Sequence, residues 1–137
     1  MSVVIPSGII QKVATSIDPK QAIIDAVGNI DDFELADDLV LMGIYFRPEK
    51  TKGGIIRPNA NVEEDAYQGK VGLVLKWGPN AFRSPEDGEL YEWRVNVGEW
   101  AFFKVGDAWQ TSVKGYPCRI GKDVAIRGKV KDPSIIF

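Results

Sequence analysis

Residues 39–46 read LVLMGIYF, a run that is apolar at nearly every position and ends just before Pro48. Such a run predicts a strand buried on both faces for part of its length, and the proline limits its far end. A second strand is predicted over 69–78, GKVGLVLKWG, and a third over 100–105, WAFFKV. Shorter runs between glycine turns predict further strands over 109–113, 116–120 and 124–130. The sequence therefore predicts a mainly β fold, a small barrel or a sandwich, without an internal repeat.

The N-terminal residues 1–37 are predicted to form an arm that carries one short helix. Asp18 can cap the free amides of this helix, and Pro19 suits its first turn. Gly28 can adopt the closing conformation, so the helix is expected over about residues 19–27. A helix this short is not stable alone in water, so its apolar face must pack against something. That face carries three side chains that we take as candidate assembly contacts with a neighbouring molecule: Ile23, Ile24 and Val27.

Two long polar segments interrupt the predicted strands. Residues 47–68 contain proline, lysine, a Gly-Gly pair and three consecutive acids, and residues 79–94 are rich in Pro, Asp, Glu and Gly. The first is far longer than the usual connection of about two to six residues, which indicates a functional or a disordered loop. Trp93 lies in the second loop and is expected at a surface contact with another molecule. Residues 131–137 are expected to form a C-terminal tail.

The composition excludes several classes of function. The 137 residues suit one domain, and 17 Lys and Arg against 19 Asp and Glu leave a formal charge of −2. The chain therefore has no excess of basic residues that could bind the phosphate groups of nucleic acid or of an anionic membrane. The chain has no histidine and one cysteine, which removes Ser-His and Cys-His pairs and most zinc and copper sites. We therefore expect a non-enzymatic protein of the cytoplasm, without catalytic residues, cofactor, metal, secretory signal or membrane span.

Several smaller features have simpler explanations than a ligand site. Gly53 and Gly54 are not followed by the Lys-Ser/Thr and helix of a phosphate-binding loop. The acidic run 63–65 lacks the spacing of a calcium loop and is typical of a solvated surface. Cys118 has no histidine partner and is expected to be a buried core thiol. Three tryptophans in or beside strands are expected in the core or at a subunit interface: Trp77, Trp100 and Trp109.

Four segments in order resemble the GroES-type co-chaperonin family, over residues 38–130. After the first strand, 49–58 reads EKTKGGIIRP, similar to the family's mobile loop with its Gly-Gly-hydrophobic-hydrophobic centre. The strand at 69–79 resembles the family's next strand, and 97–103, VGEWAFF, is similar to its Val-Gly-Asp-x-Val-x-Phe element. The segment 120–126, IGKDVAI, resembles the region of its last strand.

This resemblance implies a GroES-like β-barrel subunit that forms a sevenfold homo-oligomeric ring and closes a chaperonin cage. A polar, Gly-rich segment with a short apolar patch suits such a role, because weakly binding loops gain effective concentration when a ring links them. The partner-binding loop that the resemblance implies consists of Gly53, Gly54, Ile55, Ile56, Arg57 and Pro58.

The chain also departs from the compact family members. Arg57 stands where the family usually has a third apolar residue, residues 1–37 have no counterpart, and the loop 79–94 is long, acidic and aromatic. Divergent members occur in tailed bacteriophages, and these departures favour that origin. The first expectation is a phage co-chaperonin that caps a host chaperonin while capsid protein folds.

The alternative is a virion protein that decorates or cements the capsid shell by contact with the major capsid protein. The zinc alcohol dehydrogenases contain a related barrel. This chain lacks the residues that would bind their zinc and is too short to include their nucleotide-binding domain, so that class is rejected.

Overall fold

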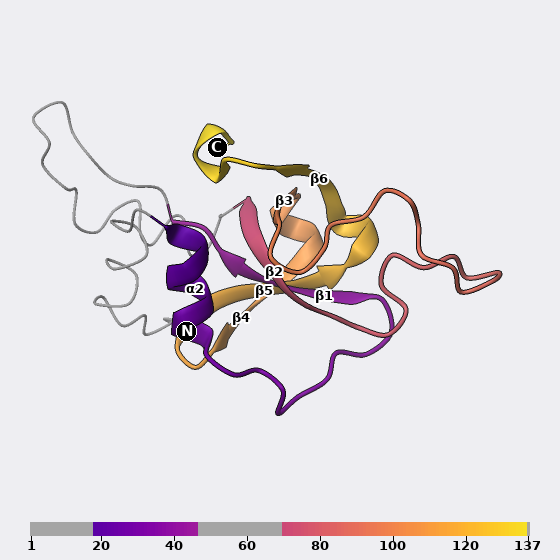
Figure 1. The fold of residues 1–137 in the computed structure, drawn as a ribbon, viewed down its shortest axis with the longest axis horizontal. Coiled ribbons are helices and arrows are strands. Elements are labelled where there is room, and N and C mark those ends of the chain that lie inside the picture. Colours follow the sequence, from indigo (N-terminus) through magenta and orange to yellow (C-terminus); the bar gives the residue numbers. More distant parts are fainter. Residues whose placement is uncertain (1–17, 47–69, 137) are drawn as a thin grey trace, which may run out of the picture.

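A computed structural model describes residues 18–46 and 70–136 of the chain (Figure 1). These residues form one helix, three single-turn 3₁₀ helices and six strands, which confirms the predicted mainly β fold. The helices are α2 (Pro19–Val27), η1 (Val105–Asp107), η2 (Asp123–Ala125) and η3 (Pro133–Ile135). The strands are β1 (Leu39–Ile44), β2 (Val71–Trp77), β3 (Trp100–Phe103), β4 (Ala108–Val113), β5 (Tyr116–Lys122) and β6 (Ile126–Val130). No helix in these ranges is long and apolar enough to cross a membrane.

The six strands form one antiparallel sheet in the order β4-β5-β1-β2-β3-β6. The central strand β1 pairs with β2, where Val40 faces Trp77, and with β5, where Leu39 faces Lys122. Closure into a barrel would need a ladder between the two outer strands, β4 and β6. None joins them among the described residues, so the described sheet is open.

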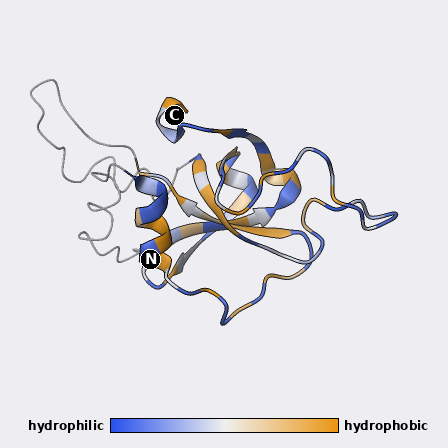
Figure 2. Cartoon of the chain, in the orientation of Figure 1, coloured by the Kyte–Doolittle hydropathy of each residue, from blue (hydrophilic) through white to orange (hydrophobic). Residues whose placement is uncertain are grey.

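The core surrounds the two central strands. Every residue of β1 after Leu39 is buried, as is the first part of β2, in agreement with the prediction of a strand apolar on both faces. The apolar colouring of Figure 2 is concentrated on these strands. The hydroxyl of Tyr116 on β5 donates to the backbone oxygen of Ile44 at 2.5 Å, which satisfies a phenol that is otherwise enclosed by apolar side chains.

Helix α2 has the bounds that the sequence predicts. The Asp18 carboxylate accepts a hydrogen bond from the Gln21 backbone at 3.2 Å, and Pro19 occupies the first turn. The helix ends at Gly28, whose φ of +62° is a conformation that side chains with a Cβ rarely adopt. Local capping therefore determines where this helix begins and ends.

The apolar face of α2 packs inside the chain, which corrects the assembly-contact prediction for two of its three residues. Ile23 is 0% exposed and Val27 is 2% exposed, and both belong to the core of this same subunit. Gly43 on β1 makes room for the helix, because a Cβ at this position would lie 2.7 Å from Cγ2 of Ile23. Only Ile24, at 38% exposure, is accessible to another molecule.

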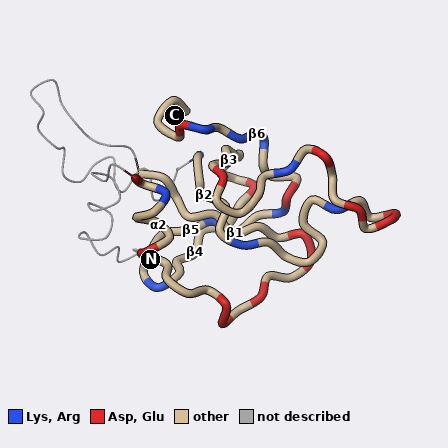
Figure 3. The backbone as a smooth tube through the Cα atoms, in the orientation of Figure 1, with Lys and Arg blue, Asp and Glu red and all other residues tan. Residues whose placement is uncertain are grey.

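The acidic connector between α2 and β1 is held by two lysines from the sheet. The Lys76 ammonium donates to the backbone oxygen of Ile30 at 2.6 Å and lies 4.8 Å from the ring centre of Phe33. The Lys114 ammonium donates to the oxygen of Asn29 at 2.7 Å. Acidic residues mark this connector and the tip of the loop that follows β2 in Figure 3. The lysines thus guide an acidic segment along the sheet to the start of β1.

Candidate functional site

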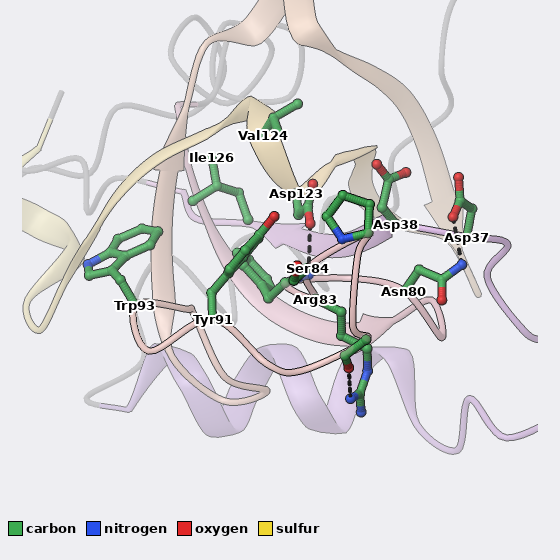
Figure 4. A pocket seen from close by; sticks show the side chains of 13 residues that line it. Asp37, Asp38, Asn80, Arg83, Ser84, Tyr91, Trp93, Asp123, Val124 and Ile126 are labelled. Atoms are coloured by element: carbon green, nitrogen blue, oxygen red, sulfur yellow. Dashed lines mark hydrogen bonds between the residues drawn. The ribbon is translucent and has the colours of Figure 1, made fainter.

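A cleft of about 660 Å³ lies at the end of the sheet where β1 begins. Because β1 runs antiparallel to both of its neighbours, its first residues lie beside the ends of β2 and β5. The cleft is therefore lined by the connector before β1, the loop after β2 and the η2 turn after β5 (Figure 4).

Hydrogen bonds fix these three segments to one another. The Asp123 carboxylate, on a residue only 8% exposed, accepts from the backbone N–H of Phe82 at 2.7 Å. The backbone N–H of Asp123 donates to the oxygen of Asp38 at 3.0 Å. Asn80 donates to Asp37 twice, through its backbone N–H and its side-chain amide, each at 2.8 Å. The three segments that line the cleft are therefore held together by hydrogen bonds.

One end of the cleft is apolar. Tyr91 is 46% exposed, Trp93 50% and Val124 71%, and the buried side chain of Ile126 lies between them in Figure 4. The Lys129 ammonium lies 5.9 Å from the ring centre of Trp93, close enough for a cation–π contact. Large apolar side chains thus remain accessible together in one cleft.

The other end carries the carboxylates of Asp37 and Asp38, and the carboxylate of Asp123 lies between the two ends. The guanidinium of Arg83, also in the lining, donates to the backbone oxygen of Gly88 at 3.0 Å and points away from these carboxylates in Figure 4. Within the described ranges, no hydrogen bond or ion pair involves the Asp38 carboxylate. A negative charge is therefore available to an incoming ligand.

The predicted site residues have different outcomes. Trp93 is exposed, as expected for a residue at a surface contact, and it lines the cleft. The loop residues Gly53, Gly54, Ile55, Ile56, Arg57 and Pro58 lie outside the described residues, as do the arm 1–17 and the acidic run 63–65. Ile24 remains accessible on α2 and does not line the cleft.

The exposure of the cysteine and the tryptophan side chains tests the prediction that they lie in the core. Cys118 is fully buried, as predicted, and burial raises the pKa of its thiol to about 12. Trp100 is buried and Trp77 is half-buried, with its indole N–H donating to the Val95 oxygen at 3.1 Å. Trp109 is 57% exposed on the outer strand β4, so the core interpretation is wrong for it and the interface interpretation stays a prediction.

Asp38, Asp123 and Val124 were not predicted as members of a common site. The acidic connector and the aromatic loop are visible in the sequence, but only the β1–β5 register brings Leu39 beside Lys122 and so joins them to the η2 turn. No group of three or more His, Cys, Asp or Glu suited to a metal ion occurs in the described part of the chain. Comparison of the sequence with protein-family models and with curated proteins finds no match.

Proposed function

We propose that this protein is a non-enzymatic assembly subunit on a GroES-like barrel, a phage co-chaperonin whose ring caps a chaperonin cage while capsid protein folds. The observation that carries the proposal is the position of the two long connections. Phe46 and Lys70 flank the segment 47–69 at the end of the β1–β2 pair where Tyr45 donates to the oxygen of Val71 at 3.0 Å. The loop 79–94 leaves the opposite end of that pair, after Trp77.

A subunit of a cage cap needs two long connections at opposite ends, because its two ends have different tasks. One end of each subunit must bind the rim of the cage, and the other must close the space above it. The segment 47–69 contains the Gly53–Pro58 sequence proposed to bind the chaperonin, so its two flanks would direct it toward the cage. The loop 79–94, with exposed Leu90, Tyr91 and Trp93, would then face the top of the ring.

The outer strands support assembly into a ring. Strands β4 and β6 each pair on one side only among the described strands, and unpaired strand edges favour pairing with another chain. A ring that places β4 of one subunit near β6 of the next would cover both edges and complete the barrel-like surface. Trp109, exposed on β4, would be buried at that contact.

Binding to a purified chaperonin tests the proposal with the double variant Ile55→Ser/Ile56→Ser. Burial of each isoleucine contributes about 1.5–3 kcal/mol, so we expect binding to weaken at least about tenfold. The melting temperature should stay unchanged, because these residues are proposed to contact the partner. Val97→Ser/Ile135→Ser, at residues 60% and 69% exposed, is the matched control and should bind normally. Unchanged binding of the Ile55/Ile56 variant would contradict the proposal.

The second candidate function is decoration of the phage capsid. The exposed aromatic side chains around the cleft favour it, because large accessible apolar groups gathered in one place suit a permanent protein contact. Measurement of this protein in purified particles separates the two functions. A stoichiometric amount in the particle supports decoration, whereas absence from particles together with chaperonin binding supports the cage cap.

A further inference from the structure

The cleft beside η2 combines accessible apolar surface with negative charge. Tyr91, Trp93 and Val124 are each close to half exposed or more, although apolar side chains of this size gain free energy when they are buried. They line one part of a single cleft, and the carboxylates of Asp37 and Asp38 lie at its other end (Figure 4). Accessible apolar residues grouped in this way mark an interaction site.

The charge of the cleft defines the chemistry of its occupant. The lining contains three carboxylates, Asp37, Asp38 and Asp123, against one arginine, Arg83, and the loop 79–94 carries four further acidic residues outside the lining. Asp38 has no ion-pair partner among the described residues, and Arg83 is bonded to the backbone of its own loop. A complementary ligand carries apolar side chains beside a cation and lacks acidic groups.

The first 17 residues of this chain have that composition. They read MSVVIPSGIIQKVATSI, contain no Asp or Glu, and have Lys12 as their only charged side chain. Ile9, Ile10 and Val13 surround this lysine in the sequence. The segment 47–69 also has basic and apolar residues, but its four acidic residues make it a poorer match for an acidic cleft.

The position of α2 favours docking between copies over docking within one. Asp18 and Pro19 lie in a hollow with Tyr45 and Trp100, at the end of the sheet opposite the cleft. Residues 1–17 are attached at that far end, so a neighbouring subunit can present its cleft without the segment having to cross its own sheet. A contact from the far end of one copy to the near end of the next is heterologous and can close into a ring.

We propose that the cleft binds residues 1–17 of a second copy of this chain, with Lys12 against Asp38 and with Ile9, Ile10 and Val13 on the wall of Tyr91, Trp93 and Val124. The inference goes beyond the cage-cap function and does not depend on the chaperonin contact of Gly53–Pro58, because it concerns a contact between copies other than the β4–β6 contact proposed for the ring. Failure of the Ile55/Ile56 experiment would leave it standing.

Exchange of the two charges tests this contact by sedimentation of the full-length chain. Lys12→Glu alone opposes Asp38 with a like charge, and Asp38→Lys alone opposes Lys12. Each variant is expected to self-associate at least about tenfold more weakly than the wild type. An equimolar mixture of the two should regain association, because each cleft then meets an arm of opposite charge on the other variant. Lys104→Glu and Asp31→Lys make the same charge changes at exposed residues outside the cleft and should associate as the wild type does.

Three results would overturn the proposal. Wild-type chains that stay monomeric would exclude a second copy as the occupant. Single variants that associate normally would show that the two charges do not meet. Recovery in the double variant Lys12→Glu/Asp38→Lys, without recovery in the mixture, would place the arm in the cleft of its own subunit. A synthetic peptide of residues 1–17, added in excess, should dissociate the wild-type assembly if the contact forms as proposed.

Discussion

Cys118 and Tyr116 lie on the same strand with their ionisable groups inside the core. Burial raises the pKa of the Cys118 thiol to about 12 and raises the pKa of the Tyr116 hydroxyl well above its usual range. Both groups therefore keep their protons in the folded chain at pH values where the unfolded chain releases them. The folded state binds more protons than the unfolded state in that range, so stability must fall as pH rises.

We expect the free energy of unfolding to decrease between about pH 8 and about pH 11, and to decrease less steeply in Cys118→Val. The valine variant still declines because Tyr116 remains. Urea titrations at a series of pH values measure both slopes. Equal slopes for the two proteins would show that the thiol does not contribute. The native thiol should also resist iodoacetamide until the chain is unfolded.

For helix α2, the sequence predicts where the helix begins and ends but not what it packs against. Its bounds were predictable, because Asp18, Pro19 and Gly28 act on their own backbone. Its packing was not, because the space for Ile23 depends on Gly43, which belongs to a separate element. The strands were predictable from apolar runs and glycine turns. The cleft was not, because it requires the register of β1 against β5.

The two neighbouring isoleucines of α2 provide a matched test of this packing. Ile23→Ala is expected to lower the free energy of unfolding by about 2–5 kcal/mol, because it leaves a cavity against β1. Ile24→Ala, at a residue 38% exposed, should cost less than about 1 kcal/mol. Urea denaturation monitored by circular dichroism gives both values. Similar losses for the two variants would mean that α2 does not pack through Ile23.

In the folded subunit, helix α2 and the sheet share one core. Removal of residues 1–17 keeps the helix and its Asp18 cap, so at protein concentrations where the wild type is monomeric the shortened chain should melt close to the wild-type temperature. Removal of residues 1–37 also deletes Ile23 and Val27 from the core, and this chain should melt much lower or not fold at all. Thermal melts of both chains make the comparison. A stable product of the longer deletion would show that the sheet alone is an independent folding unit.

The position of β1 at the centre of the sheet affects how the chain folds while it is being synthesised on the ribosome. One of its neighbours, β2, is the next described strand of the chain, but the other, β5, is synthesised much later. During translation, this apolar strand therefore remains uncovered on one side until β5 has emerged. Long-range pairings of this kind form slowly, and exposed apolar strands tend to aggregate meanwhile. A protein proposed to help another chain fold thus passes through a vulnerable nascent state of its own.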